Sequence, residues 1–378
     1  MKNVNTKTFW LCICIGVIIR YILMSLGHNF DFDSYCIVGE LASAGKNIYA
    51  NTTRYNYGPV WFTFLGIFWR TALYFTHNIA VFRILVVSIL TLADFLMAKL
   101  ISKRAGSLWG VIFFLNPVSL IITGYHNQFD NIAVLIGAYA VLCIQDSCSE
   151  REIKAGDIYG IILLTLSLMT KHILWAFPLW ILFSRKIDAR KKILYAFIPP
   201  LIFLLSFVPY WSEGSHGIIH RVFLYKSFNN FPLFALRILN YLGVSIPFQE
   251  YICLPVFGLL MLAGAYMFRR ESIGNSFLLY TIALVCFSSA IANQYLAIPC
   301  MAVILMFRNK SALYFCTGFV YLSCTLDGLH IPYWLNNNFG CEFNLLVLIL
   351  SKGSVMYTLL VWCLLFYLIY YCRHNMSH

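Results

Sequence analysis

Two aspartates one residue apart, Asp31 and Asp33, begin a polar stretch in a chain that is otherwise very apolar. Carboxylates beside a membrane are costly in free energy unless they have a partner or a function. A positioned carboxylate can deprotonate a hydroxyl nucleophile, and such acid–base catalysis contributes typically about 10²–10⁴-fold to a rate. We therefore interpret residues 27–76 as the catalytic loop of a membrane enzyme, with the two aspartates as its candidate catalytic residues.

A phosphate leaving group suits such a base, because it needs no strong acid when cations hold its charge. The tyrosine, tryptophan and asparagine side chains of the same regions suit sugar rings, which offer flat apolar faces and hydroxyl groups. The candidate phosphate-binding cations are Lys46, Arg54, Lys171, Arg221 and Lys226. Together these features favour transfer of a sugar from a lipid-phosphate donor.

Each of these features also has a purely structural interpretation. An Asp-x-Asp motif is weak on its own, and a cation such as Lys171 is normal at the end of a helix. Asp130 could cap the helix that follows it. Tyr55, Tyr57 and Trp61 could belong to an aromatic belt at the membrane interface.

The composition excludes an ordinary soluble domain. Of the 378 residues, 61% are hydrophobic and only 11% are charged, whereas soluble proteins are about 25% charged. Apolar runs of membrane-spanning length recur from end to end, which predicts a single all-α polytopic membrane domain over residues 1–378. The net charge of +12 does not indicate nucleic acid, because most basic residues lie in short loops, where they set the orientation of the spans.

About twelve membrane spans are expected from the order of the apolar runs. Lys2 and Lys7 precede the first run, so the positive-inside rule places the N-terminus in the cytoplasm, and the span count places the C-terminus there as well. Residues 60–75 and 231–246 are short or broken, and whether they cross stays open. We prefer a surface position for 60–75, because it keeps the basic end of the following span inside.

With this topology, the polar clusters that could do chemistry converge on the outer face. They are the aspartates at 31 and 33, residues 126–130, Lys171 with His172, residues 216–226 and residues 293–295. This convergence predicts one active site that faces away from the cytoplasm. In the span after residue 78, Arg83 and Asp94 share a helical face, and we expect a structural ion pair between them.

The first outer loop resembles that of the GT-C glycosyltransferases. The matching segments are Asp31-Phe32-Asp33, Gly45 to Tyr49, and Tyr55 to Pro59. They correspond to the D-x-D motif, the G-x-x-P-Y turn and the Y-x-Y-x-P end of that family. Two departures occur, Ile48 at the usual proline and Gly58 at a frequent threonine or proline.

Later segments continue the resemblance in the same order. Asn116-Pro117 with residues 124–130 is similar to the family's N-P…G-Q-F-D segment, with Asn127 at the glycine position. Lys171-His172 is similar to a K-H pattern, and residues 293–299 to a Q-Y-x-x-x-x-P segment. The chain looks most similar to bacterial polyprenol-phosphate-mannose-dependent mannosyltransferases and to the catalytic subunit of GPI mannosyltransferase I.

The resemblance implies a GT-C helix bundle with interfacial helices in the first outer loop. It implies inverting transfer of a hexose, with mannose preferred, from a polyprenyl- or dolichyl-phosphate donor. It assigns catalysis to the first-loop aspartates, with Asp33 preferred as base and Asp31 as the orienting residue, although their order stays open. A D-x-D motif suggests a divalent metal, but the lipid-phosphate-dependent members mostly need none, so no obligatory metal or other cofactor is expected.

The matched segments and outer cations also define the expected substrate-binding residues. These are Lys46, Arg54, Tyr55, Tyr57, His126, Gln128, Asp130, Lys171, His172, Arg221, Lys226, Gln294 and Tyr295. The acceptor would be a glycolipid, a lipid-linked glycan or a polysaccharide. No ER retention signal is visible, so a bacterial plasma membrane is preferred over the ER. The alternatives are a lipid or glycan transporter or flippase, favoured by short broken segments, and another membrane transferase of polysaccharide assembly.

Overall fold

The computed structural model describes residues 3–75, 78–225, 246–288, 292–324 and 353–375, with a few single positions between these ranges. Every regular element in the described residues is a helix, and none of them forms a strand. The expected all-α class is therefore confirmed. Of the predicted surface or re-entrant piece at 231–246, most lies outside the described residues.

The helices of the first third of the chain contain the predicted catalytic loop. They are α1 (Thr6–Leu26), α2 (Phe30–Ser43), α3 (Ile48–Asn51), α4 (Pro59–Phe75) and α5 (Ile79–Ala105). The middle of the chain forms α6 (Ser107–Leu115), α7 (Pro117–Ile121), the π-helix η1 (Ile122–His126), α8 (Asp130–Gln145), α9 (Ala155–Thr170), the 3₁₀ turn η2 (His172–Leu174) and α10 (Phe177–Phe183).

The remaining described helices complete the bundle. They are α11 (Ala189–Leu205), η3 (Val208–Tyr210), α12 (Trp211–Gly217), the π-helix η4 (Ile218–Phe223), α14 (Gln249–Met267), α15 (Ile273–Phe287), η6 (Asn293–Ala297), α16 (Cys300–Phe307), η7 (Arg308–Lys310), α17 (Ser311–Cys324) and α20 (Gly353–Asn375).

Asparagine side chains set several of the helix starts. Asn29, Asn47 and Asn78 each accept a hydrogen bond from a backbone N–H in the first turn of α2, α3 and α5. Asn116 caps α7 in the same way, and Pro117 follows at the first helical position. These caps satisfy N–H groups that have no partner within the helix. Asn29 and Asn47 thus set where α2 and α3 begin in the polar stretch after α1.

Four described helical segments are long and apolar enough to cross a membrane, at residues 6–26, 79–105, 189–223 and 293–324. Two bent pairs, 107–126 and 155–183, raise the number to six if each is one span. Long apolar helices of this kind indicate an integral membrane protein. The expected twelve spans are not reached among the described residues.

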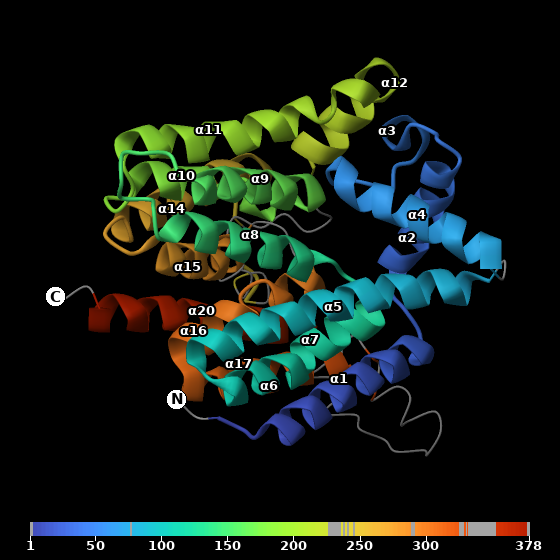
Figure 1. The fold of residues 1–378 in the computed structure, drawn as a ribbon, viewed down its shortest axis with the longest axis horizontal. Coiled ribbons are helices and arrows are strands. Elements are labelled where there is room, and N and C mark those ends of the chain that lie inside the picture. Colours follow the sequence, from blue (N-terminus) through green and yellow to red (C-terminus); the bar gives the residue numbers. More distant parts are fainter. Residues whose placement is uncertain are drawn as a thin grey trace.

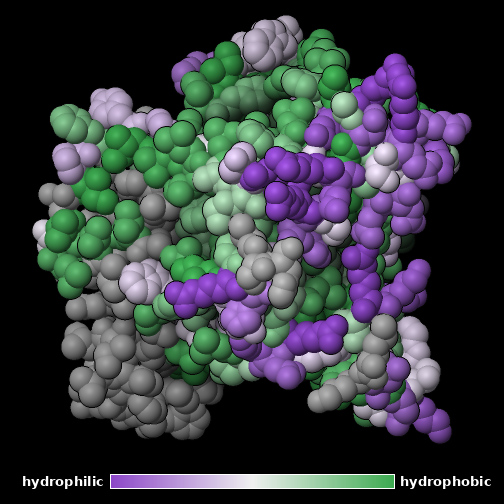
Figure 2. All heavy atoms as spheres, turned by 90° about the vertical axis from the view of Figure 1, so that its left-hand side faces the viewer, coloured by the Kyte–Doolittle hydropathy of each residue, from purple (hydrophilic) through white to green (hydrophobic). Residues whose placement is uncertain are grey.

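The long helices lie side by side along the horizontal axis of Figure 1. The start of α1 and the end of α20 lie at the left end, whereas α2, α3 and α12 lie at the right end. The left end carries the basic last turns of α5 and α20, and Figure 2 shows hydrophilic side chains over one half of this face and hydrophobic ones over much of the other. The predicted catalytic loop therefore lies at the opposite end of the bundle from both termini.

A buried ion pair joins α1 to α5 in the bundle core. The Arg20 Nη2 atom lies 2.9 Å from Asp94 Oδ2, and both side chains are almost fully buried. Asp94 Oδ2 also accepts hydrogen bonds from Ser119 and Thr123. The expected pairing of Arg83 with Asp94 is wrong, because eleven residues along an α-helix are about 16 Å of rise. Sharing a helical face is not enough for contact, and the true partner comes from another helix.

Candidate functional site

The Asp31 carboxylate is held by side chains from two different loops. It lies in the first turn of α2, where Asn29 Nδ2 donates to its Oδ2 atom at 3.3 Å. Gln128, in the short connection between η1 and α8, donates a hydrogen bond to the same oxygen. Burial raises the pKa of Asp31, and the nearby ammonium of Lys171 acts in the opposite direction. Asp31 is thus a positioned carboxylate with a proton affinity above that of an ordinary aspartate.

Asp33 lies on a different side of α2, because positions two apart in an α-helix do not face the same way. Its side chain is 56% exposed, and its Oδ1 atom is 3.7 Å from His28 Nδ1. The structure therefore separates the two aspartates of the motif. Asp31 joins the buried polar groups, whereas Asp33 lies at the surface beside His28.

Lys171 and Asp130 form a second buried pair next to Asp31. Lys171 Nζ lies 2.6 Å from Asp130 Oδ2, and the two side chains are 5% and 0% exposed. The ammonium also lies 5.0 Å from the Tyr57 ring centre and 4.8 Å from that of Phe129. Asp130 Oδ1 has no hydrogen-bond partner among the described residues. The pair holds a cation in place between two aromatic faces.

A glycine brings the first outer loop onto the end of α9. A Cβ atom added to Gly58 would lie 2.2 Å from the Met169 carbonyl oxygen. The loop and the helix end therefore touch through their backbones, two residues before Lys171. This close approach explains how Tyr57, from one region of the sequence, reaches Lys171 from another.

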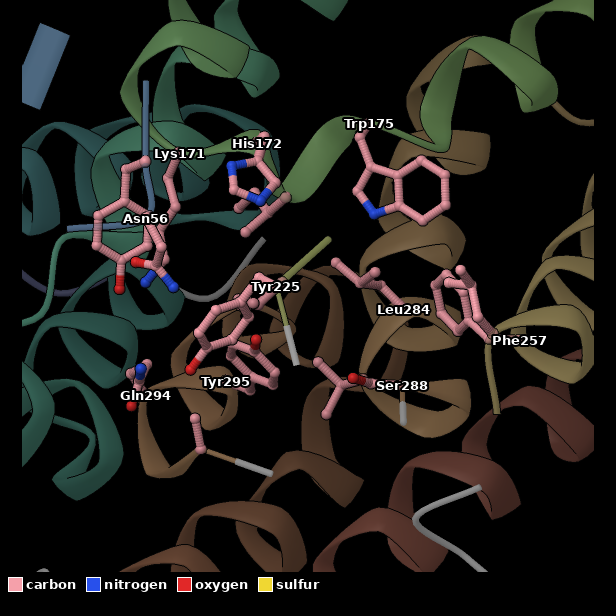
Figure 3. Close-up of a pocket in the computed structure, with 16 residues that line it drawn as sticks. Asn56, Lys171, His172, Trp175, Tyr225, Phe257, Leu284, Ser288, Gln294 and Tyr295 are labelled. Atoms are coloured by element: carbon pink, nitrogen blue, oxygen red, sulfur yellow. The ribbon is translucent and has the colours of Figure 1, made fainter. Parts of the chain in front are cut away.

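A cavity of about 200 Å³ lies directly beside this ammonium (Figure 3). It is lined at one end by polar groups that the sequence analysis selected from three separate regions: Tyr57, Lys171, His172, Gln294 and Tyr295. The opposite end is apolar, with Trp175, Phe257 and Leu284 (Figure 3), and the apolar side chains of Leu254 and Ile298 also line the cavity. Figure 3 shows Lys171 and Trp175 at the two ends of one side of the cavity with His172 between them, and Tyr225 and Tyr295 across from them. The cavity can therefore accept a ligand with one charged and one apolar part.

Asp31 does not line this cavity but lies close to it. Its carboxylate helps to raise the pKa of Tyr225, a residue of the cavity wall, together with burial. It also raises the pKa of Tyr57, where burial is the largest cause. The Asp31 carboxylate therefore lies near enough to affect two tyrosines of the cavity wall.

Several other predicted binding residues have structural contacts instead of a place in the cavity wall. Arg54 donates to Ser34 Oγ at 3.0 Å and to the Phe30 carbonyl at 3.2 Å, and so fastens the start of α2. The Tyr55 hydroxyl donates to the Gly58 carbonyl and accepts from the Phe62 N–H. These two residues shape the loop around Asp31.

The remaining predicted residues that the structure describes do not line the cavity. Arg221 donates to the Thr52 carbonyl, and Lys46 is exposed in the turn after α2. His126 is fully buried, and its Nδ1 atom lies 3.3 Å from Asn29 Nδ2. Lys226 lies outside the described residues.

Sequence reasoning missed the residues that lack a charge or a matched motif. Asn29 contacts Asp31 and His126, yet on the sequence it is one cap among several asparagines. Asn56, Tyr225 and Trp175 line the cavity. Tyr225 could have been found from its place in the aromatic segment after η4, but Trp175 looks like any tryptophan of an apolar run.

The described residues contain no group of three or more His, Cys, Asp or Glu side chains that could hold a metal ion. No model of a known protein family matches this chain, and a comparison with curated proteins finds no relative.

Proposed function

We propose that this chain is a GT-C-type glycosyltransferase that moves a hexose, with mannose the first candidate, from a polyprenyl-phosphate donor to a hydroxyl acceptor. The observation that carries the proposal is the cavity beside Asp31, with Lys171 at one end and Trp175 and Phe257 at the other. A lipid-phosphate sugar has a matching distribution of charge and apolar surface. Cations and aromatic faces are the groups that hold phosphates and sugar rings.

In this proposal Asp31 is the general base, because Asn29 and Gln128 hold its carboxylate close to Lys171, whereas Asp33 lies at the surface. It accepts the proton of the acceptor hydroxyl as the acceptor oxygen bonds to the sugar C1 atom. The bond from C1 to the phosphate oxygen breaks, and the lipid phosphate leaves with the electron pair. Lys171, 2.6 Å from Asp130, stabilises the charge that develops on the phosphate. Attack opposite to the leaving group inverts the configuration at C1.

The wider expectations belong to the same proposal. They comprise a bundle of about twelve spans, both termini in the cytoplasm, and a site on the outer face of a bacterial plasma membrane. The basic left end and the opposite position of α2 in Figure 1 agree with this orientation. Neither a metal nor another cofactor has an assigned step.

The test is sugar transfer by purified protein in lipid vesicles, with polyprenyl-phosphate-mannose and polyprenyl-phosphate-glucose offered separately to an acceptor extract. We expect one donor to be consumed at the same rate with and without EDTA. Absence of consumption of both donors would contradict the proposed donor class. Loss of consumption in EDTA would contradict the proposed independence from metal.

A further inference from the structure

Arg83 of α5 is a charged residue that the proposed chemistry does not use, and it contacts both loops that hold Asp31. Its Nε atom donates to Asn127 Oδ1 at 2.9 Å. Its Nη2 atom donates to the Gly27 carbonyl, at the turn between α1 and α2. The same nitrogen lies 3.5 Å from the Tyr125 carbonyl. One guanidinium therefore fastens the loop before Asp31 to the loop that carries Gln128.

Asn127 is built for this contact. Its backbone is in the left-handed region, with φ at 58°, a conformation that asparagine tolerates better than most residues. The side chain is fully buried, and its Nδ2 atom donates to the Thr123 and Gly124 carbonyls. Its Oδ1 atom accepts the hydrogen bond from Arg83 Nε. The next residue, Gln128, then donates to Asp31.

We propose that Arg83 and Asn127 form a clasp that positions Asp31 by fixing Gln128 against its carboxylate. The inference deepens the proposed function and rests on it for its meaning in catalysis. Neither residue touches the cavity, so both are positioning residues. Arginine suits this role because its planar fork donates in two fixed directions at once, which lysine cannot reproduce.

The clasp predicts a change in the titration of Asp31. Without it, Gln128 no longer donates reliably to the carboxylate, and a lost hydrogen bond to the charged form favours the protonated form. The other groups that face Asp31 are unchanged by the test variants: Lys171, Arg54, Asp130, Tyr35, Tyr57, Tyr225 and Tyr295, with His126 behind Asn29. A shift between variants therefore reports on the clasp itself.

The experiment compares R83K, R83M and N127G in the full chain in lipid vesicles. R83K keeps the charge but loses the planar fork. N127G keeps the left-handed backbone but loses the acceptor for Arg83, together with the Nδ2 bonds to the Thr123 and Gly124 carbonyls. We expect each to lower kcat about tenfold or more, a part of the contribution of a positioned base. We also expect the acid limb of the pH–rate profile to move to higher pH. The double variant R83M/N127G should lose less activity than the product of the two single losses, because both single variants break the same Arg83–Asn127 contact.

The matched control is R70K. Arg70 also donates from Nε and Nη2 to a backbone carbonyl of the first outer loop, that of Ser43 at 2.9 and 2.5 Å, but it does not contact the loop of Gln128. We expect no shift of the acid limb in R70K. Equal acid limbs in the wild type, R83K and N127G would overturn the clasp, and so would multiplicative losses in the double variant.

A second readout separates this inference from the proposed function. The Asp31 carboxyl stretch, identified as the infrared band that D31N removes, can be titrated without any substrate. A higher midpoint in R83K and N127G than in the wild type would support the clasp even if no sugar donor were consumed. An unchanged midpoint would refute it even in an active transferase.

Discussion

Lys171 and Asp130 are joined by a 2.6 Å contact in which both side chains are almost completely buried. The two residues lie 41 positions apart and come from the end of α9 and the start of α8. Removing one partner of a buried pair strands the other charge, whereas removing both charges often costs little. The pair is therefore a place where stability and activity can be separated.

K171M should destabilise the protein by about 3–5 kcal/mol, because Asp130 would lose its buried counter-charge. The double variant K171M/D130N should recover most of that stability. It should not recover sugar transfer, because no cation then faces the phosphate. Thermal unfolding in detergent and a transfer assay check the two parts. If the double variant regained activity with its stability, Lys171 would have a structural role alone.

The pH dependence of activity should follow the protonation of Asp31. Because burial raises its pKa above the ordinary aspartate value, the carboxylate form needed for a base is lost as the pH falls through that raised pKa. The acid limb of kcat/KM should therefore lie above the pH at which a free aspartate titrates. The measurement is a pH–rate profile in vesicles, and an acid limb at the ordinary value would contradict the assignment.

The same shift has an effect on stability with the opposite direction in pH. A carboxyl with a raised pKa in the folded state binds its proton more tightly there than in the unfolded chain. Its contribution to stability is thus present below the ordinary pKa and is lost as the pH rises through the raised pKa. D31N should remove this dependence, and D33N should leave it in place. Unfolding followed across mildly acidic pH checks it.

The contact of Gly58 with the end of α9 should not tolerate a methyl group. G58A places a Cβ atom 2.2 Å from the Met169 carbonyl oxygen, and such overpacking costs typically about 1–3 kcal/mol. We expect transfer activity to fall, because the loop with Tyr57 is displaced from Lys171. G258A is the matched control, since a Cβ atom there meets nothing within 4 Å. Equal activity of the two variants would contradict the proposed role of this contact.

The apolar end of the cavity should recognise the lipid part of the donor. Trp175 is 47% exposed and its ring lies 5.8 Å from that of Phe257. W175A should raise KM for long-chain polyprenyl donors and leave KM for a short-chain analogue unchanged. W10A is the control, because Trp10 has a similar exposure of 50% but lies on α1. The same KM change for both chain lengths would show that this end does not hold the lipid.

The helical class and the grouping of Tyr57, Lys171, His172, Gln294 and Tyr295 could be predicted because apolar length and polar clusters are visible along the chain. Contacts between helices could not be predicted in this way. Arg20 and Asp94 are 74 residues apart, and nothing in either neighbourhood points to the other. Arg83 was therefore given the wrong partner.

The difference between Asp31 and Asp33 also depends on information that a motif does not contain. The two residues look equivalent in the sequence, and the resemblance slightly favours Asp33 as base. Once residues 30–43 form a helix that starts at the Asn29 cap, the two side chains must point in different directions. Asn29 and Gln128 both donate to Asp31 and not to Asp33, and the position of Gln128 is set by a loop 97 residues further along the chain.

The most direct test of the account is donor consumption by D31N and D33N beside the wild type, in the same vesicles and with folded protein quantified for each. We predict that D31N loses activity by about 10²-fold or more, as expected for a lost general base, whereas D33N keeps most of it. Full activity of D31N, or a loss confined to D33N, would contradict the central claim that Asp31 is the base.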